Sequence, residues 1–203
     1  MIKLVKSFMA AAGLAFVFTA PAQSAVISWT TDVPAADTGV LSPTSTVGTV
    51  FENLTTSVPS EYRSPWQGTA FDGTGTYTSV QEDSYASYVF DQGYHQVDFM
   101  WGSVDTYNGL EFYYQGSWVD ALYGNDAQLD SVNNGLGFII ASVMAIDIFD
   151  EIRFTSGTNA FEYANLTVSA VPLPAALPLY GAGLAAMGFI GWRKRRKAAA
   201  IAA

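Results

Sequence analysis

The chain has 203 residues, which suits one ordinary domain between two terminal segments. It has no cysteine, which excludes disulfides, thiolate metal sites and cysteine nucleophiles within this chain. Residues 26–170 hold all eighteen acidic residues but only Arg63 and Arg153 of the nine basic ones, a net charge of −16 that excludes nucleic acid as a partner.

Residues 1–25 have the form of a secretory signal peptide. Two lysines come first, an apolar run follows over residues 8–18, and small residues close the segment. We expect export through the Sec translocon and cleavage after Ala22 or Ala25. The alternative is an uncleaved N-terminal anchor, which the short run disfavours, because a spanning helix needs about 20 apolar residues.

Residues 26–170 are the expected mature body, and their pattern predicts an all-β fold. Short stretches rich in β-branched and aromatic residues alternate with Gly, Asn, Asp, Ser and Pro, and no stretch holds a helical period. We expect a single antiparallel β-sandwich, jelly-roll-like, with a surface loop over residues 32–46. The expected strands are 26–31, 47–54, 76–81, 85–90, 95–101, 109–114, 117–122, 137–143, 148–155 and 160–170.

Two of these stretches alternate with the period of a strand. The odd positions of 97–101 are apolar or aromatic, and so are the even positions of 110–114. Because an Asn-Gly pair, a strong turn signal, ends the loop between them, we expect neighbouring antiparallel strands with aromatic inner faces. His95, the only histidine, is interpreted as a strand-face residue and not as a zinc ligand or catalytic base.

Glycoside hydrolysis needs two carboxylates, and a body with eighteen acids always offers a pair. The spacing singles none out, so we interpret these side chains as solvated surface acids and expect no catalysis. No serine elbow, phosphate loop or dinucleotide fingerprint is present in the sequence. The pairs considered are Glu82 with Asp83, Asp98 with Glu111, and Asp150 with Glu151.

Calcium is the metal that the turns of this body favour. Carboxylate and carbonyl oxygens are its ligands, and an acidic domain attracts cations. A general association with cations is the firmer expectation, because the sequence lacks the Asp-x-Asp-x-Asp-Gly loop. The candidate ligands are Asp72, Asp105, Asn108 and Asp126.

Aromatic residues outside the core would suit a carbohydrate ligand. Most of the tryptophans and tyrosines must fill the interior of a sandwich of this size. Trp66 is the least core-like, because it lies in a loop with proline and glycine, and Trp118 begins a strand after a glycine. We predict that one or both stack on a sugar ring, with exopolysaccharide as the ligand class.

After Ala170 the composition changes abruptly. Residues 171–174 form a stiff extended spacer with two prolines. Residues 175–192 carry no charge and as a helix would span roughly 27 Å, close to a hydrocarbon core of about 30 Å. The alternatives are an ordinary single-pass anchor and a buried core helix. A core helix would not end in the five cations that follow and that keep this end cytoplasmic. These are Arg193, Lys194, Arg195, Arg196 and Lys197.

This tail, residues 171–203, resembles the VPLPA variant of the PEP-CTERM sorting signal of bacterial proteins handled by exosortases. The matching motif is Val171, Pro172, Leu173, Pro174 and Ala175, followed by the apolar segment and the basic cluster. The resemblance implies insertion in the inner membrane, then removal of the tail by an exosortase-type enzyme and display or release at the cell surface. Leu173 departs from the usual Pro-Glu-Pro, which leaves the type of processing enzyme open, and residues 198–203 extend beyond the basic cluster.

The body is similar in two stretches to exosortase-dependent surface proteins. Residues 100–108 and 110–113 resemble their "WGS-D-YN" segment, and residues 160–165 resemble their "AFEIDN" last strand, with Ala164 in place of aspartate. The resemblance implies a β-sandwich but does not indicate an activity. We therefore expect a non-catalytic cell-surface or extracellular-matrix protein that binds polysaccharide and calcium. A secreted glycan-active enzyme and a self-associating coat protein are the alternatives.

Overall fold

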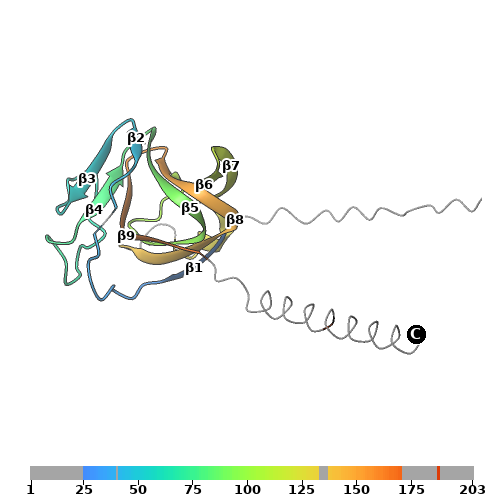
Figure 1. The fold of residues 1–203 in the computed structure, drawn as a ribbon. Coiled ribbons are helices and arrows are strands. Elements are labelled where there is room, and N and C mark those ends of the chain that lie inside the picture. The colour runs from blue at the N-terminus through green and yellow to red at the C-terminus, as the bar shows by residue number, and fades with distance from the viewer. Residues whose placement is uncertain (1–24, 40, 133–136, 171–186, 188–203) are drawn as a thin grey trace, which may run out of the picture.

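The computed structural model describes residues 25–39, 41–132, 137–170 and 187, and this part of the chain is all-β (Figure 1). Nine strands, all paired antiparallel, form one sheet in the order β3-β4-β9-β5-β8-β6-β7, with β1 added to β8 and β2 to β5. The elements are β1 (Val26–Thr30), β2 (Ser45–Val47), β3 (Val50–Leu54), β4 (Tyr77–Val80), β5 (Ser84–Trp101), β6 (Asn108–Tyr114), β7 (Ser117–Tyr123), the 3₁₀ turn η1 (Ala127–Leu129), β8 (Ile139–Ser156) and β9 (Phe161–Ser169).

The two longest strands, β5 and β8, make this sheet sandwich-like. They pair with each other at both ends, with register shifts between Val89 and Gln96. The first half of β5 also pairs with β2, while its second half pairs with β9. Likewise β8 pairs with β1 through its first half and with β6 through its second. One bent pair of strands therefore contributes to two layers, which curl around a shared core (Figure 1).

Aromatic rings from both layers fill the space between them. Phe154 of β8 stacks on Tyr163 of β9 with ring centroids 3.9 Å apart and 12° between planes. The Tyr163 hydroxyl shares a hydrogen bond of 2.9 Å with that of Tyr88 on β5. Inward residues occupy alternate positions of each strand, and the predicted inner face of 97–101 is confirmed as buried. Of the face predicted over 110–114, Leu110 and Phe112 are buried, whereas Tyr114 is only half-buried.

A second, smaller core covers the other side of the layer that contains β4, β9 and β5. Its buried members are Trp66, Tyr77, Met100 and Ala164. Met100 and Ala164 are register partners on β5 and β9, and they face away from the main core. The long segment between β3 and β4 supplies Trp66 and thereby covers this outer surface.

The structure corrects several sequence expectations. Stretches 85–90 and 95–101 belong to the single strand β5, and 137–143 and 148–155 overlap the single strand β8, because the chain bends without leaving the ladder. The stretches 97–101 and 110–114 are not neighbours, since β8 lies between β5 and β6. The Asn-Gly pair begins β6 and makes no hairpin turn. Finally, Gly48 splits the strand expected over 47–54, since its φ of 76° interrupts extended backbone.

The expected signal peptide and the sorting tail lie outside the described residues, except for Ala25 and Met187. Among the described residues, no helix is long and apolar enough to cross a membrane.

Candidate functional site

One of the two layers consists of β2, β6 and β7 with the first half of β5 and the second half of β8, and we call it the second layer. Its outward side carries a cluster of aromatic and charged side chains, which we name the aromatic face. Strands β5, β8, β6 and β7 contribute to it. Its residues are Tyr85, Glu111, Tyr113, Trp118, Tyr123, Glu151 and Arg153.

Strand register places these side chains on one side of the sheet. Glu111 of β6 is the partner of Arg153 on β8, and Tyr113 is the partner of Glu151. Tyr113 is also the partner of Trp118 across the β6–β7 pair. Since directly opposed residues of antiparallel strands share a face, all five project away from the core. The residues between them, such as Phe112, point inward and are buried.

Arg153 lies at the centre of the aromatic face. Its guanidinium carbon is 4.0 Å from the ring centroid of Tyr113 and 5.1 Å from that of Tyr85, so two rings from different strands flank one cation. Its Nε donates to Glu151 Oε1 over 2.6 Å. Burial lowers the pKa of the Arg153 guanidinium, but the hydrogen bond and the charge of Glu151 raise it by more. The pKa is therefore above its ordinary value. The charge therefore persists, and the rings are held in place.

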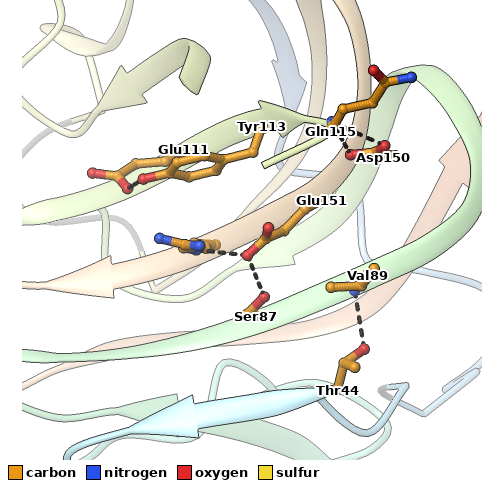
Figure 2. A network of polar contacts seen from close by, with 9 residues as sticks. Thr44, Ser87, Val89, Glu111, Tyr113, Gln115, Asp150 and Glu151 are labelled. Carbon is orange, nitrogen blue, oxygen red and sulfur yellow. Dashed lines mark hydrogen bonds and ion pairs between the residues drawn. The ribbon is translucent and has the colours of Figure 1, made fainter. Parts of the chain in front are cut away.

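The carboxylates of this face are engaged by donors from neighbouring strands. Glu151 also accepts from the Ser87 hydroxyl at 2.7 Å, as Figure 2 shows. Glu111 accepts from the Tyr113 hydroxyl at 2.8 Å and from the Tyr123 hydroxyl at 3.2 Å. Burial, followed by the Glu111 bond, raises the pKa of Tyr113 to about 12, so its hydroxyl remains a donor at neutral pH. The network orients the rings.

The two tryptophans predicted to stack on sugars have opposite environments. Trp118 is 59% exposed on the aromatic face, where Tyr123 is 44% exposed. Trp66 is fully buried, so the prediction that it lies outside the core is wrong. Its Nε1 donates to the Thr76 carbonyl at 3.0 Å, and a Cβ at Gly75 would approach its ring to 2.6 Å. The loop that contains Trp66 folds inward because only glycine permits this approach.

The four candidate calcium ligands are not gathered into one cluster. Asp105 and Asn108 share the turn before β6, where Asn108 is buried and donates through its side chain to the Ser103 carbonyl at 3.1 Å. Asp72 accepts from the Gly68 amide, and Asp126 caps η1 through the Gln128 amide. Among residues 25–39, 41–132 and 137–170, no group of three or more metal-ligating side chains occurs.

Two of the three carboxylate pairs considered in the sequence are separated or engaged. Asp98 accepts from Gln96 on its own strand and lies in the other layer from Glu111. Asp150 of β8 accepts at 3.0 Å from the amide of Gln115, which lies in the turn between β6 and β7 (Figure 2). Each oxygen contact named here joins the carboxylate to a group of the same sheet or of an adjoining turn.

Sequence reasoning found Trp118 but not Arg153 or the two tyrosines that flank it. The signal available was weak, because Arg153 is one of only two basic residues in the body and occupies an outward position of a strand. Its partners come from β5 and β6, which are separated in the sheet by β8 itself.

Comparison with known proteins gives no family. No family model matches the chain, and no curated protein matches it. Among solved structures, the crystal structure of the Agl-KA catalytic domain is similar over 72% of this chain, with a TM-score of 0.34 and 19% identity. The match covers 31% of that chain, and a likeness of this extent carries no argument about fold or activity.

Proposed function

We propose that this chain is an exported, exosortase-sorted surface or matrix protein whose jelly-roll-like body binds polysaccharide without catalysis. The signal-like N-terminus and the VPLPA-type tail support the route, since their order and charges are those of a protein inserted with its body outside. The all-β, strongly acidic body supports a role outside the cytoplasm.

The aromatic face is the observation that supports polysaccharide as the ligand. Trp118 and Tyr123 expose flat apolar rings, and Tyr113 is fixed against Arg153. A sugar ring has apolar C–H faces that pack on such rings and hydroxyls that bond with carboxylates and guanidinium groups at their edges. Because Tyr113 and Tyr123 are held by Glu111 before any ligand arrives, little entropy of these two side chains is lost on binding.

The same contacts favour binding over hydrolysis. A glycosidase needs one carboxyl that donates a proton and one free carboxylate, each facing the scissile bond. On the aromatic face, Glu111 accepts from two tyrosine hydroxyls and Glu151 from Ser87 and Arg153. Both are therefore positioning groups in this proposal. In this proposal, calcium acts only as a counter-ion of the acidic surface.

Affinity measurements on the full-length chain in a neutral detergent test this function. The exopolysaccharide of the producing cell is immobilised, and retention is measured with and without calcium. We expect Trp118→Ala to weaken retention about tenfold, since loss of one stacked ring costs about 1.4 kcal/mol. Trp29→Ala is the matched control, because Trp29 is 37% exposed on β1 in the other layer.

Three results would contradict the proposal. Equal retention of the Trp118→Ala and Trp29→Ala variants would remove the aromatic face as the site. Release of reducing ends from the polysaccharide would identify a glycan-active enzyme. Concentration-dependent growth of large assemblies, without any retention, would identify a coat protein.

The sorting route has its own test. Replacing residues 193–197 with neutral residues should block tail processing or invert the topology, because cytoplasmic cations set the orientation of the apolar segment. Processing is followed by the size of the product in membrane and surface fractions. Unchanged maturation would exclude the tail assignment.

A further inference from the structure

A groove of about 400 Å³ lies where the start of β9 meets two loops. Its lining comes from the turn at 57–63, from Ser103 and Tyr107 after β5, and from Asn159, Ala160 and Glu162. The groove shares no residue with the aromatic face, so a ligand bound in it is independent of polysaccharide binding.

The groove contains a carboxyl group whose hydrogen bonding is incomplete. Glu162 is 2% exposed, and its Oε1 accepts from the backbone N–H of Arg63 at 2.8 Å. Its Oε2 is buried and has no hydrogen-bond partner among the described residues. Such an oxygen costs stability, on the order of 1–3 kcal/mol, and native proteins keep few of them. The Ser103 hydroxyl in the same lining favours the ionised carboxyl, but it makes no hydrogen bond with Oε2 in the structure, so this oxygen is open to a donor from a ligand.

The walls around this carboxyl are held in place. Val58 and Tyr62 exchange two backbone hydrogen bonds, of 2.9 and 3.1 Å, which close the turn. The Tyr62 ring packs on Phe51 with centroids 5.3 Å apart. Across the groove, the Tyr107 hydroxyl donates to the Asn159 carbonyl at 3.0 Å. The groove is therefore formed before a ligand enters.

The electrostatics of the groove favour a cation. Burial, with a further contribution from the Asp105 carboxylate, raises the pKa of Glu162 to about 7. Glu61 adds a second acidic side chain to the lining, and the exposed Arg63 directs its Nε to Gln67 Oε1 at 2.8 Å. A positive group beside Glu162 would restore its ionised form and supply the missing donor at once. A neutral hydroxyl would supply only the donor.

The residues of the lining favour an organic cation over a metal ion. Val58, Pro59 and Ala160 present apolar surface, and the rings of Tyr62 and Tyr107 flank the same space. Aromatic rings attract ammonium groups, and apolar walls suit a methylene stem. A hydrated metal ion would gain nothing from these walls, and no cluster of three metal-ligating side chains occurs in the described residues.

We infer that this groove binds a primary ammonium group on an aliphatic stem, with the Glu162 carboxylate as its counter-ion and hydrogen-bond acceptor. A lysine side chain and a free aliphatic diamine share this chemistry.

Titration of the full-length chain in neutral detergent with n-pentylamine tests the inference, with 1-pentanol as the uncharged equivalent. The readout is the NMR amide resonance of Arg63, which reports on Glu162 through its hydrogen bond. We expect saturable shifts with the amine and none with the alcohol. Nα-acetyl-lysine amide and 1,5-diaminopentane then distinguish the two sources, because only the true source should bind more tightly than n-pentylamine.

The pH dependence is set by the ionisation of Glu162. The amine stays protonated between pH 6 and 8, and burial raises the pKa of Tyr107 to about 12 and that of Tyr77 further, so both tyrosines stay neutral. Asp105 and Glu61 are the acids that face the carboxyl, and Arg63 is the cation. With a Glu162 pKa of about 7, affinity should be about tenfold higher at pH 8 than at pH 6.

Two variants with equal changes of net charge decide the outcome. Glu162→Gln keeps an oxygen for the Arg63 amide and should lower amine affinity at least tenfold. Asp91→Asn, at an exposed position of the β5 bend, should leave it unchanged. Equal binding of amine and alcohol, or full affinity of a folded Glu162→Gln variant, would overturn the inference. Loss of amine binding in Trp118→Ala would likewise contradict a separate site.

Discussion

The interior and the aromatic face are built from the same kinds of residue but hold them in different ways. In the interior, rings pack on rings, as Phe154 does on Tyr163 with centroids 3.9 Å apart, and both are fully buried. On the aromatic face, rings pack on a cation, and their hydroxyls bond with carboxylates. The neighbouring residues Arg153 and Phe154 belong to opposite regions. Aromatic content alone therefore says nothing about role, since the period of two along β8 decides it.

The largest expected effect is on the interior. Phe154→Ala should lower the free energy of unfolding by about 3–5 kcal/mol, because it removes a buried ring and leaves a cavity. Phe154 touches the rings of Tyr88, Phe99, Phe161 and Tyr163, so the cavity cannot be filled by one neighbour. Denaturant unfolding measures the loss, with Phe154→Leu as the milder control. A loss below about 1 kcal/mol would show that the two layers do not share this core.

The next effect concerns a buried group that belongs to neither region. The pKa of Glu162 is raised from its ordinary value of 4.5 to about 7, chiefly by burial, so the folded chain holds this proton more tightly than the unfolded chain. Its contribution to stability is therefore full at low pH and is lost as pH rises through 7, by about 3 kcal/mol at most. Glu162→Gln should lose less stability than the parent between pH 5 and pH 8. Parallel pH profiles of the two chains would mean that this carboxyl is solvated.

A smaller effect is expected at the centre of the aromatic face. Arg153→Ala should cost about 1 kcal/mol, because it removes a half-buried ion pair and the contact between two rings. Arg153→Lys keeps the charge but not the planar stacking, and should recover only part of this loss. Unfolding at low and high salt separates the two contributions. If Arg153→Ala lowered the free energy of unfolding as much as Phe154→Ala, Arg153 would contribute to stability like a core residue.

The smallest effect on stability is expected at the edge of the face. Trp118→Ala should change the free energy of unfolding by no more than about 0.5 kcal/mol, since the ring is 59% exposed on a strand at the end of the sheet order. Trp66→Ala is the internal comparison and should cost several-fold more, because Trp66 is fully buried. Equal costs for the two tryptophans would contradict their assignment to different regions.

The fold class was predictable from local pattern, whereas the pairing of strands was not. The strands that became β1, β6, β7 and β9 were predicted within two residues at each end, because period-two alternation and turn residues are local signals. The bends inside β5 and β8 resembled turns, since Asp, Gln and Gly occupy residues 91–93. Whether a bend ends a strand depends on whether the neighbouring strand continues to pair beyond the bend. For the bend in β5 this neighbour is β8, which lies more than forty residues away in the sequence.

Of the candidate binding residues, exposure separated the two tryptophans in a way that the sequence did not indicate. Trp66 lies among residues typical of a surface loop, yet Gly75 and Phe71 enclose it. Glu162 was one of eighteen acids with nothing to distinguish it. Its carboxyl is buried because the turn at 57–63 packs against β9, a contact that the sequence pattern does not indicate.

By itself, the sequence determined the all-β class, the acidic body without cysteine, and the alternation that assigns each strand residue to a face, because these depend on composition and on neighbours along the chain. The tertiary structure decided that β8 lies between β5 and β6, that Arg153 lies between Tyr113 and Tyr85, and that Glu162 is buried with one oxygen unpartnered among the described residues. These properties depend on contacts between segments far apart in the chain. Such contacts stabilise the protein only after the two layers have packed together.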